Sequence, residues 1–186
     1  GTVFILPGRG EFIDCYGPTI QKMRSAGYAV AALDPRGQGL SDRFEADRRR
    51  GHLDDFLIHQ RDLEEIFALE AVSELPQPLF VLANSMGGAI AWRAASSFLR
   101  PHAMVLTAPM LGVMMPPGGR FLAQKSAELA CKLGFSTSYV PGATPEPYPL
   151  RQGFVGNALT GSAEAYRRFQ SQFRAETDLC LGGPTY

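Results

Sequence analysis

Ser85 stands in a run of very small residues, Ala-Asn-Ser-Met-Gly-Gly at positions 83–88. The run follows an apolar stretch at residues 79–83 and leads into a helical pattern, which predicts a sharp turn from strand to helix. Such a turn strains the backbone of its central residue and excludes bulky side chains two positions away on either side. Ala83 and Gly87 occupy those two positions. The spacing therefore predicts that Ser85 is a nucleophile with an exposed hydroxyl.

We call residues 83–88 the nucleophile elbow. Its remaining members are predicted to shape the turn, and they include Asn84, Gly87 and Gly88. Small residues at the start of the helix would let it pack closely under the sheet, and its first amide hydrogens would face a developing oxyanion. The alternative is that Ser85 only caps the helix, a common role for serine. The strand on one side and the helix on the other favour the nucleophile.

A second motif, Pro-Gly-Arg-Gly-Glu at residues 7–11, follows an apolar run at residues 3–6. Taken alone it is typical of a plain turn, because Pro-Gly is a common turn signal. A phosphate-binding loop is disfavoured, since no Gly-Lys-Ser/Thr follows the glycines. A third motif, Asp-Pro-Arg-Gly-Gln-Gly-Leu-Ser, occupies residues 34–41, and we expect Asp34 and Arg36 to brace that loop.

The three motifs together resemble one branch of the α/β-hydrolases, that of the monoacylglycerol lipases, bacterial lysophospholipases and serine aminopeptidase-like hydrolases. That branch carries H-G-x-G-E, then D-x-R-G-x-G-x-S, then G-H-S-M-G-G, in the order in which residues 7–11, 34–41 and 83–88 follow here. Pro7 and Asn84 replace the two histidines of the pattern. We expect these changes to affect the wall of the pocket and not the backbone donors.

The resemblance implies both a reaction and a site. Ser85 would attack the carbonyl of a carboxylic ester, and the backbone amides of Arg9 and Met86 would form the oxyanion hole. The strand order would be second, first, third, fourth, which brings these three residues to one edge of the sheet. The implied substrate is a lysophospholipid or a monoacylglycerol, with a peptide as the enzymatic alternative. No cofactor is implied.

The rest of a catalytic triad is not found in this sequence. The resembled branch orders its triad as Ser, then Asp or Glu, then His. His102 is the only histidine after Ser85, and it precedes the fourth predicted strand, at the wrong end. Asp178 is the last acidic residue, and no histidine follows it. We therefore expect the triad acid and base in sequence beyond residue 186.

Two explanations of this incompleteness are open. In the first, the chain is part of a longer enzyme and is inactive alone, which its strand-like opening without an initiator Met also favours. In the second, it is a degenerate scaffold that binds a ligand or partner without catalysis. A scaffold has no need to retain Ser85, the glycines of the nucleophile elbow or the loop around Arg9. We therefore favour the longer enzyme.

The elements that would position these residues alternate along the first part of the chain. Strands are predicted at residues 3–6, 28–33, 79–83 and 103–107, and helices at 18–26, 54–75 and from the elbow to about 98. The first two strands are continuous apolar runs, typical of strands buried on both faces. Alternation of strand and helix predicts parallel βαβ units. The predicted fold class is α/β, a partial doubly wound parallel sheet of the α/β-hydrolase fold with a helical cap insertion.

The pattern changes after Pro109. No strand is predicted between residues 109 and 178. Helices are predicted at residues 120–133 and at 164–173, the second capped by Ser162. This stretch therefore indicates a helical insertion, not a continuation of the sheet.

Three regions follow from these patterns. Residues 1–108 are predicted as the N-terminal part of the core, 109–180 as a helical cap or lid, and 181–186 as the return towards the core. The Met-rich stretch at residues 110–115 fits either core packing or an adaptable lining for acyl chains.

Composition limits the partners. The chain has 186 residues with 18 basic and 18 acidic side chains, so no net charge attracts nucleic acid or an anionic membrane. No apolar run approaches the roughly 18 residues that span a bilayer. Three scattered cysteines suggest a reducing compartment and fit no metal site with the three histidines. We expect a small lipid-like ester as partner, no metal, and a location in the cytoplasm or at the inner membrane face. The oligomeric state is open.

Overall fold

The computed structural model describes all residues, 1–186, and divides them into two compact units. Gly1–Asp42 and Leu53–Leu111 form the first, which we call the sheet unit. Arg43–His52 and Gly112–Tyr186 form the second, which we call the helical unit. The helical unit is therefore built from two stretches of chain that are far apart in sequence.

Four parallel strands form the centre of the sheet unit. They are β1 (Thr2–Leu6), β2 (Ala29–Ala32), β3 (Leu79–Asn84) and β4 (Ala103–Thr107). Their order is β2-β1-β3-β4, as the resemblance implied. Leu6 pairs with Ala83, so the carboxyl ends of β1 and β3 lie side by side. Loops that follow these two strands therefore meet at the carboxyl ends of the strands.

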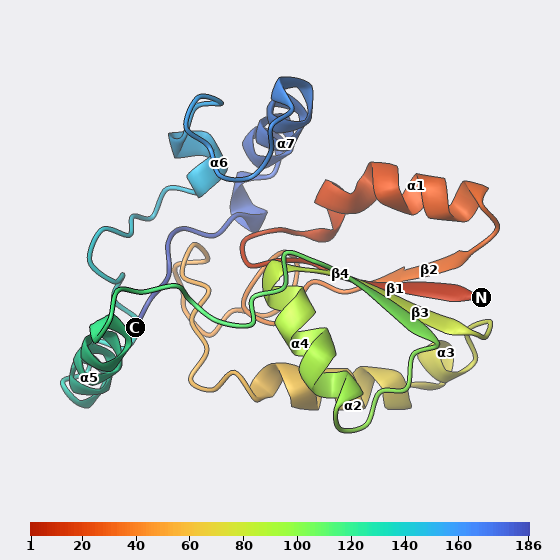
Figure 1. Ribbon diagram of the computed structural model, residues 1–186, viewed down its shortest axis with the longest axis horizontal. Coiled ribbons are helices and arrows are strands. Elements are labelled where there is room, and N and C mark those ends of the chain that lie inside the picture. The colour runs from red at the N-terminus through yellow and green to blue at the C-terminus, as the bar shows by residue number, and fades with distance from the viewer. The chain divides into compact units, whose positions relative to one another are not determined.

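Helices cover both faces of this sheet. They are η1 (Ile13–Tyr16), α1 (Gly17–Ser25), α2 (Ile58–Ala68), α3 (Glu70–Ser73) and α4 (Ser85–Ala95). Figure 1 shows α1 on one face of the sheet and α2 and α4 on the other. This arrangement confirms the predicted doubly wound α/β fold.

The core of the sheet unit lies between the sheet and the two helices α2 and α4. Its buried cluster includes Phe4, Leu6, Leu63, Val81, Ala83, Met86, Ile90, Ala91, Ala94 and Leu99. Every residue of β1 is buried, because β2 and β3 flank it. The second strand, in contrast, was predicted to be buried and is only half-buried throughout, because β2 lies at the edge of the sheet.

The single long helix predicted at residues 54–75 is wrong. At its start, the Asp55 carboxylate accepts a hydrogen bond from the Leu57 amide at 2.9 Å, and this local bond competes with helix formation. At its end, α2 stops at Ala68 and Leu69 has an extended ψ of 134° before α3 begins. Residues 68–71 are exposed, so no core packing supports a continuous helix across this point.

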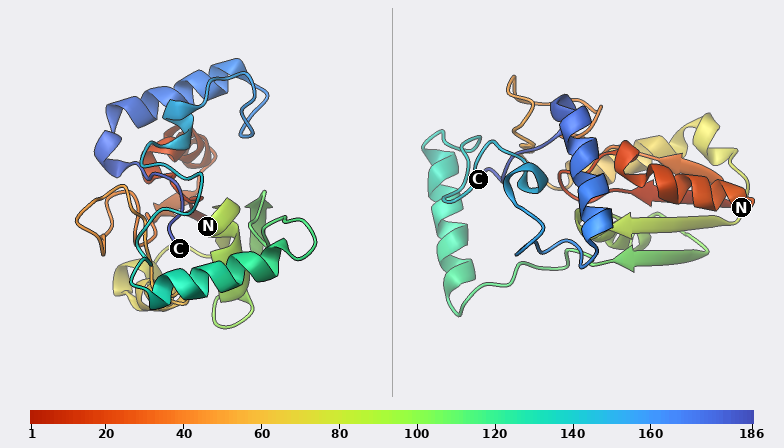
Figure 2. Two further views of the ribbon diagram at one scale, coloured as in Figure 1. Left: turned by 90° about the vertical axis from the view of Figure 1, so that its left-hand side faces the viewer. Right: turned by 90° about the horizontal axis from the view of Figure 1, so that it is seen from above.

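The helical unit contains α5 (Gly119–Lys132), α6 (Tyr148–Arg151), α7 (Ala163–Ala175) and η2 (Thr177–Leu179). Within this unit α6 packs against α7, whereas α5 stands apart from both (Figure 2). The Ser162 hydroxyl accepts a hydrogen bond from the Ala165 amide at 3.2 Å, which confirms the predicted cap of α7. No strand lies between residues 109 and 178, as predicted, although the short α6 was not anticipated.

The Met-rich stretch is not core, since Met114 is fully exposed and Met115 is 43% exposed. None of the helices in either unit is both long and apolar enough to span a lipid bilayer.

Candidate active site

Ser85 lies at the turn between β3 and α4. Asn84 is the last residue of the strand and Ser85 the first of the helix, with no residue between them. Its φ is +47°, in the left-handed region that a residue with a side chain rarely adopts. Holding a non-glycine residue there costs about 1–3 kcal/mol and requires surroundings that enforce it. The predicted strain at this position is therefore present in the backbone.

Two glycines leave the space that the turn needs. A Cβ on Gly87 would lie 2.3 Å from the Leu6 carbonyl oxygen and 2.5 Å from that of Pro7. A Cβ on Gly88 would lie 2.8 Å from the Pro109 Cβ. The first contact shows that the start of α4 packs directly on the chain leaving β1.

The loop after β4 forms a hydrogen bond to the turn at Ser85. The Met110 amide donates a hydrogen bond of 2.8 Å to the Ser85 carbonyl oxygen. Ala108, two residues earlier, also has a positive φ, of +43°. The chain leaving β4 is thus bent back to meet the nucleophile elbow.

Residues 7–11, which we call the oxyanion loop, are held by a buried glutamine that sequence reasoning missed. The Gln38 side chain donates to the Gly8 carbonyl oxygen at 2.9 Å and to that of Glu11 at 3.2 Å. Its own oxygen accepts from the Gly10 amide at 3.0 Å. Gln38 is 2% exposed. The sequence offered one sign of this role, since Gln38 lies between the two glycines of the motif at residues 34–41.

Asp34 and Arg36 brace their loop, as predicted. The Asp34 carboxylate accepts hydrogen bonds from the Ile13 amide at 2.8 Å and the Leu40 amide at 3.0 Å. Arg36 forms an ion pair of 2.6 Å with Asp62 of α2. These contacts tie the loop after β2 to the segment that follows the oxyanion loop and to α2.

The structure also pairs two predicted features that the sequence did not connect. The Asn84 side-chain amide donates to the Glu11 carboxylate, although 73 residues separate them. Arg9 lies in the oxyanion loop and Met86 in the first turn of α4, so both predicted oxyanion donors belong to the segments that meet at Gly87. Arg9 is half-buried and Met86 is buried.

His102 is not brought to this site. Its amide donates a 2.7 Å hydrogen bond to the carbonyl oxygen of Leu79, the first residue of β3. Ser85 follows the last residue of that strand, roughly 20 Å away at about 3.3 Å per residue. His102 therefore lies at the amino ends of the strands, opposite to Ser85, and is no base for it.

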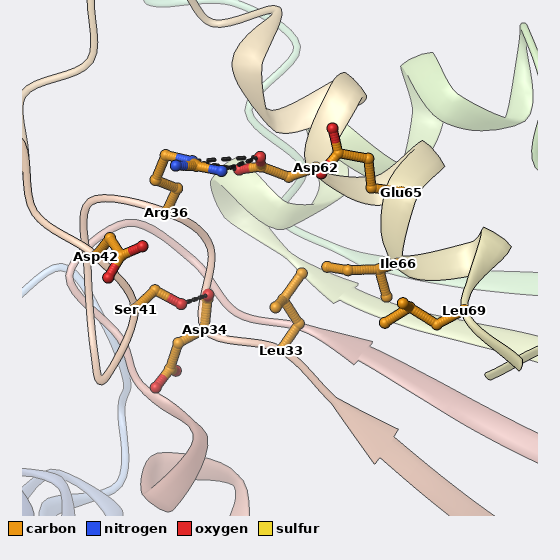
Figure 3. Close-up of a pocket in the computed structure, with 9 residues that line it drawn as sticks. All are labelled: Leu33, Asp34, Arg36, Ser41, Asp42, Asp62, Glu65, Ile66 and Leu69. Carbon is orange, nitrogen blue, oxygen red and sulfur yellow. Dashed lines mark hydrogen bonds and ion pairs between the residues drawn. The ribbon is translucent and has the colours of Figure 1, made fainter. Parts of the chain in front are cut away.

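A separate pocket of about 240 Å³ lies between the loop after β2 and α2 (Figure 3). It is lined by Leu33, Asp34, Arg36, Ser41, Asp42, Asp62, Glu65, Ile66 and Leu69. None of the predicted catalytic or oxyanion residues lines it. Its carboxylates form no metal site, because no group of three or more His, Cys, Asp or Glu in the structure is arranged to hold an ion.

Sequence comparisons find relatives of this chain. The family model described as Serine aminopeptidase, S33, matches residues 1–178. The chain is 33% identical over 197 aligned residues to Lysophospholipase L2 of Escherichia coli (strain K12). The alignment covers 99% of this chain and 54% of that protein, so the chain spans about half the length of this curated relative.

Solved structures show the same fold. A soluble variant of monoglyceride lipase from Saccharomyces cerevisiae matches with a TM-score of 0.63 at 16% identity, covering 98% of this chain and 55% of that one. A thermostable carboxyl esterase from Bacillus coagulans matches with a TM-score of 0.65 at 17% identity, covering 100% of this chain and 60% of that one. Together with the strained turn at Ser85 and the order of the four strands, the family-model match over residues 1–178 shows that the chain belongs to the serine aminopeptidase S33 family of the α/β-hydrolases.

Proposed function

We propose that the full-length protein is a serine hydrolase of carboxylic esters, with Ser85 as its nucleophile. The observation that carries the proposal is the positive φ of Ser85 at the junction of β3 and α4, beside the end of β1. A serine that only capped α4 would have no need for this strained conformation. The likeness to a lysophospholipase over 99% of the chain supports the same reaction.

In this proposal the Ser85 hydroxyl attacks the ester carbonyl and the alcohol leaves, which gives an acyl-enzyme that water then hydrolyses. The backbone amides of Arg9 and Met86 stabilise the oxyanion of each tetrahedral intermediate. A histidine and an acid outside the 186 residues act as base and orienting group. The resembled branch places both after the nucleophile, and the one histidine after Ser85 in this chain, His102, lies at the other end of the strands.

The proposed substrate is a lipid-like ester, with a lysophospholipid as the first choice and a monoacylglycerol as the second. The name of the 33% identical relative supports the first. For the helical unit we propose a role as a cap that selects the acyl chain. Its exposed apolar side chains support contact with such a chain, and they include Met114, Leu122 and Leu133. Action in the cytoplasm or at the inner membrane face belongs to the same proposal.

The test is hydrolysis by the full-length protein of three substrate classes: lysophosphatidylcholine, monoacylglycerol and aminoacyl amides. We expect fatty acid release from at least one of the first two, and a fall in kcat of at least about 10³-fold in Ser85→Ala. Cleavage of aminoacyl amides alone would identify a peptidase and contradict ester hydrolysis. No turnover of any class would support a non-catalytic scaffold.

A further inference from the structure

The Glu11 carboxylate collects hydrogen bonds from three separate segments of the sheet unit. One oxygen accepts from the Gly8 amide at 2.6 Å and from the Tyr16 hydroxyl at 2.6 Å. The Asn84 side-chain amide lies 3.0 Å from both carboxylate oxygens. Gly8 belongs to the oxyanion loop, Asn84 to the nucleophile elbow, and Tyr16 to η1. One side chain therefore joins the two halves of the candidate active site.

The Asn84 amide is held at both of its ends. Its nitrogen donates to Glu11, and its oxygen accepts a hydrogen bond of 2.8 Å from the Thr107 hydroxyl at the end of β4. An amide suits this position because it donates through one atom and accepts through the other. The residue immediately before Ser85 is thereby fixed between β4 and the oxyanion loop.

Tyr16 supports the carboxylate as a permanent donor. Burial, and next the negative charge of Glu11, raise the pKa of Tyr16 well above its usual range. The phenol therefore keeps its proton at neutral pH and remains a hydrogen-bond donor. The Tyr16 hydroxyl donates a short hydrogen bond of 2.6 Å to the Glu11 carboxylate.

We propose that Glu11 is a positioning residue, which sets the oxyanion loop at a fixed distance from the nucleophile elbow by binding Gly8 and Asn84 together. The inference rests on the proposed serine-hydrolase function. Glu11 does not touch the substrate in this role; it acts through the amides that it holds.

The proposed oxyanion hole makes this distance matter. Its two donors, the amides of Arg9 and Met86, come from segments far apart in sequence, and both must lie about 2.7–3.1 Å from the oxyanion. A misplacement of about 1 Å can lower the rate of an enzyme by about 10²-fold. Glu11 accepts hydrogen bonds from Gly8, which directly precedes Arg9, and from Asn84, which lies two residues before Met86.

The first variant is Glu11→Gln in the full-length protein. Glutamine has nearly the same shape, but its amide nitrogen would face either the Asn84 amide nitrogen or the Gly8 and Tyr16 donors. We expect kcat to fall by about 10- to 100-fold while KM changes by less than about 3-fold, because the oxyanion forms only after the substrate binds. The matched control, Glu74→Gln at an exposed position, should behave as wild type.

The second variant reverses the donor and the acceptor. Asn84→Asp alone places two carboxylates against each other and should lower kcat. In Glu11→Gln/Asn84→Asp the glutamine amide donates to the new carboxylate, and we expect kcat to recover by about 5-fold or more over Glu11→Gln. Recovery would separate a positioning role from a general loss of folding, which a second substitution would deepen.

Two results would overturn the inference. One is a kcat for Glu11→Gln equal to that of the wild type, in a protein whose turnover is abolished by Ser85→Ala. The other is a lowered kcat for Glu11→Gln with no recovery in the double variant. Turnover that survives Ser85→Ala would instead contradict the proposed function, so the two failures are distinguishable.

Discussion

Ser85 and Gly87 combine strained backbone geometry with a lack of free space. Ser85 adopts a φ of +47°, and the Met110 amide bonds its carbonyl oxygen. Gly87 lies so close to the backbone of Leu6 and Pro7 that no side-chain atom fits between them. The strained turn and the oxyanion loop therefore share one contact, and a change on either side should move both.

Gly87→Ala tests that shared contact. The added Cβ would lie 2.3 Å from one backbone oxygen and 2.5 Å from another, and neither can rotate away. We expect a loss of about 1–3 kcal/mol in the free energy of unfolding. We also expect a fall of about 10²-fold or more in ester hydrolysis, because the oxyanion loop must shift. Denaturant unfolding and steady-state kinetics of the full-length protein measure the two effects.

The matched control is Gly17→Ala in the first turn of α1, where an added Cβ meets nothing within 4 Å. That variant should keep wild-type activity and stability or gain slightly, since alanine favours a helix. Wild-type hydrolysis by Gly87→Ala would show that the oxyanion loop tolerates displacement, contrary to this account.

Single residues also show where sequence reasoning succeeds and where it stops. Ser85 and Gly87 were predictable because the strain and the crowding arise within a few residues of chain. The pairing of Glu11 with Asn84 was not, because the sequence does not state which acceptor a side chain meets 73 residues away. Gln38 was missed because its place between two glycines does not state that its side chain meets the loop at residues 8–11.

Among the elements, the apolar runs predicted the four strands to within one residue at each end. Two errors concern burial itself. The predicted helix at residues 54–75 fails at Leu69, which is 56% exposed. The second strand was predicted to be buried on both faces, yet an apolar run does not reveal that β2 lies at the edge of the sheet.

His59 on α2 is a titratable group buried within the sheet unit. It is 3% exposed, and its ring makes an edge-to-face contact with Phe56 at 5.1 Å between centroids. Burial lowers the pKa of His59, and the nearby Asp62 carboxylate only partly opposes this effect. The folded protein thus takes up a proton at His59 less readily than the unfolded chain does.

The pH dependence of stability follows from this sign. Above the unfolded pKa of about 6.5 the ring is neutral in both states and contributes nothing. As the pH falls below that value the unfolded chain binds the proton first, so the free energy of unfolding decreases, until the folded state is protonated too. In His59→Gln we expect a smaller loss of stability between about pH 7 and about pH 5 than in the wild type.

The measurement is denaturant unfolding across that pH range, with His102→Gln, at an exposed histidine, as the matched control. An equal decrease in the free energy of unfolding in the wild type and in His59→Gln would contradict the assignment of the effect to His59.

For the whole molecule, the division into a sheet unit and a helical unit adds one feature that the sequence did not suggest. Residues 43–52 belong to the helical unit although they lie between β2 and α2 in sequence. The Arg43 side chain donates to the Leu179 carbonyl oxygen at 3.5 Å, and the Gly182 amide donates to the Arg49 carbonyl oxygen at 2.9 Å. Such contacts join segments more than 130 residues apart, beyond the reach of local patterns.

The chain holds the proposed nucleophile and both proposed oxyanion amides, and it spans 54% of the length of its lysophospholipase relative. The central claim is therefore best tested on the full-length protein. We expect a fluorophosphonate probe to give one covalent adduct, which mass spectrometry of the digested protein places on Ser85. Ser85→Ala should lose the adduct, whereas Ser126→Ala, at an exposed serine of α5, should keep it. An adduct on another residue, or none on the folded full-length protein, would contradict the account of Ser85 as the nucleophile.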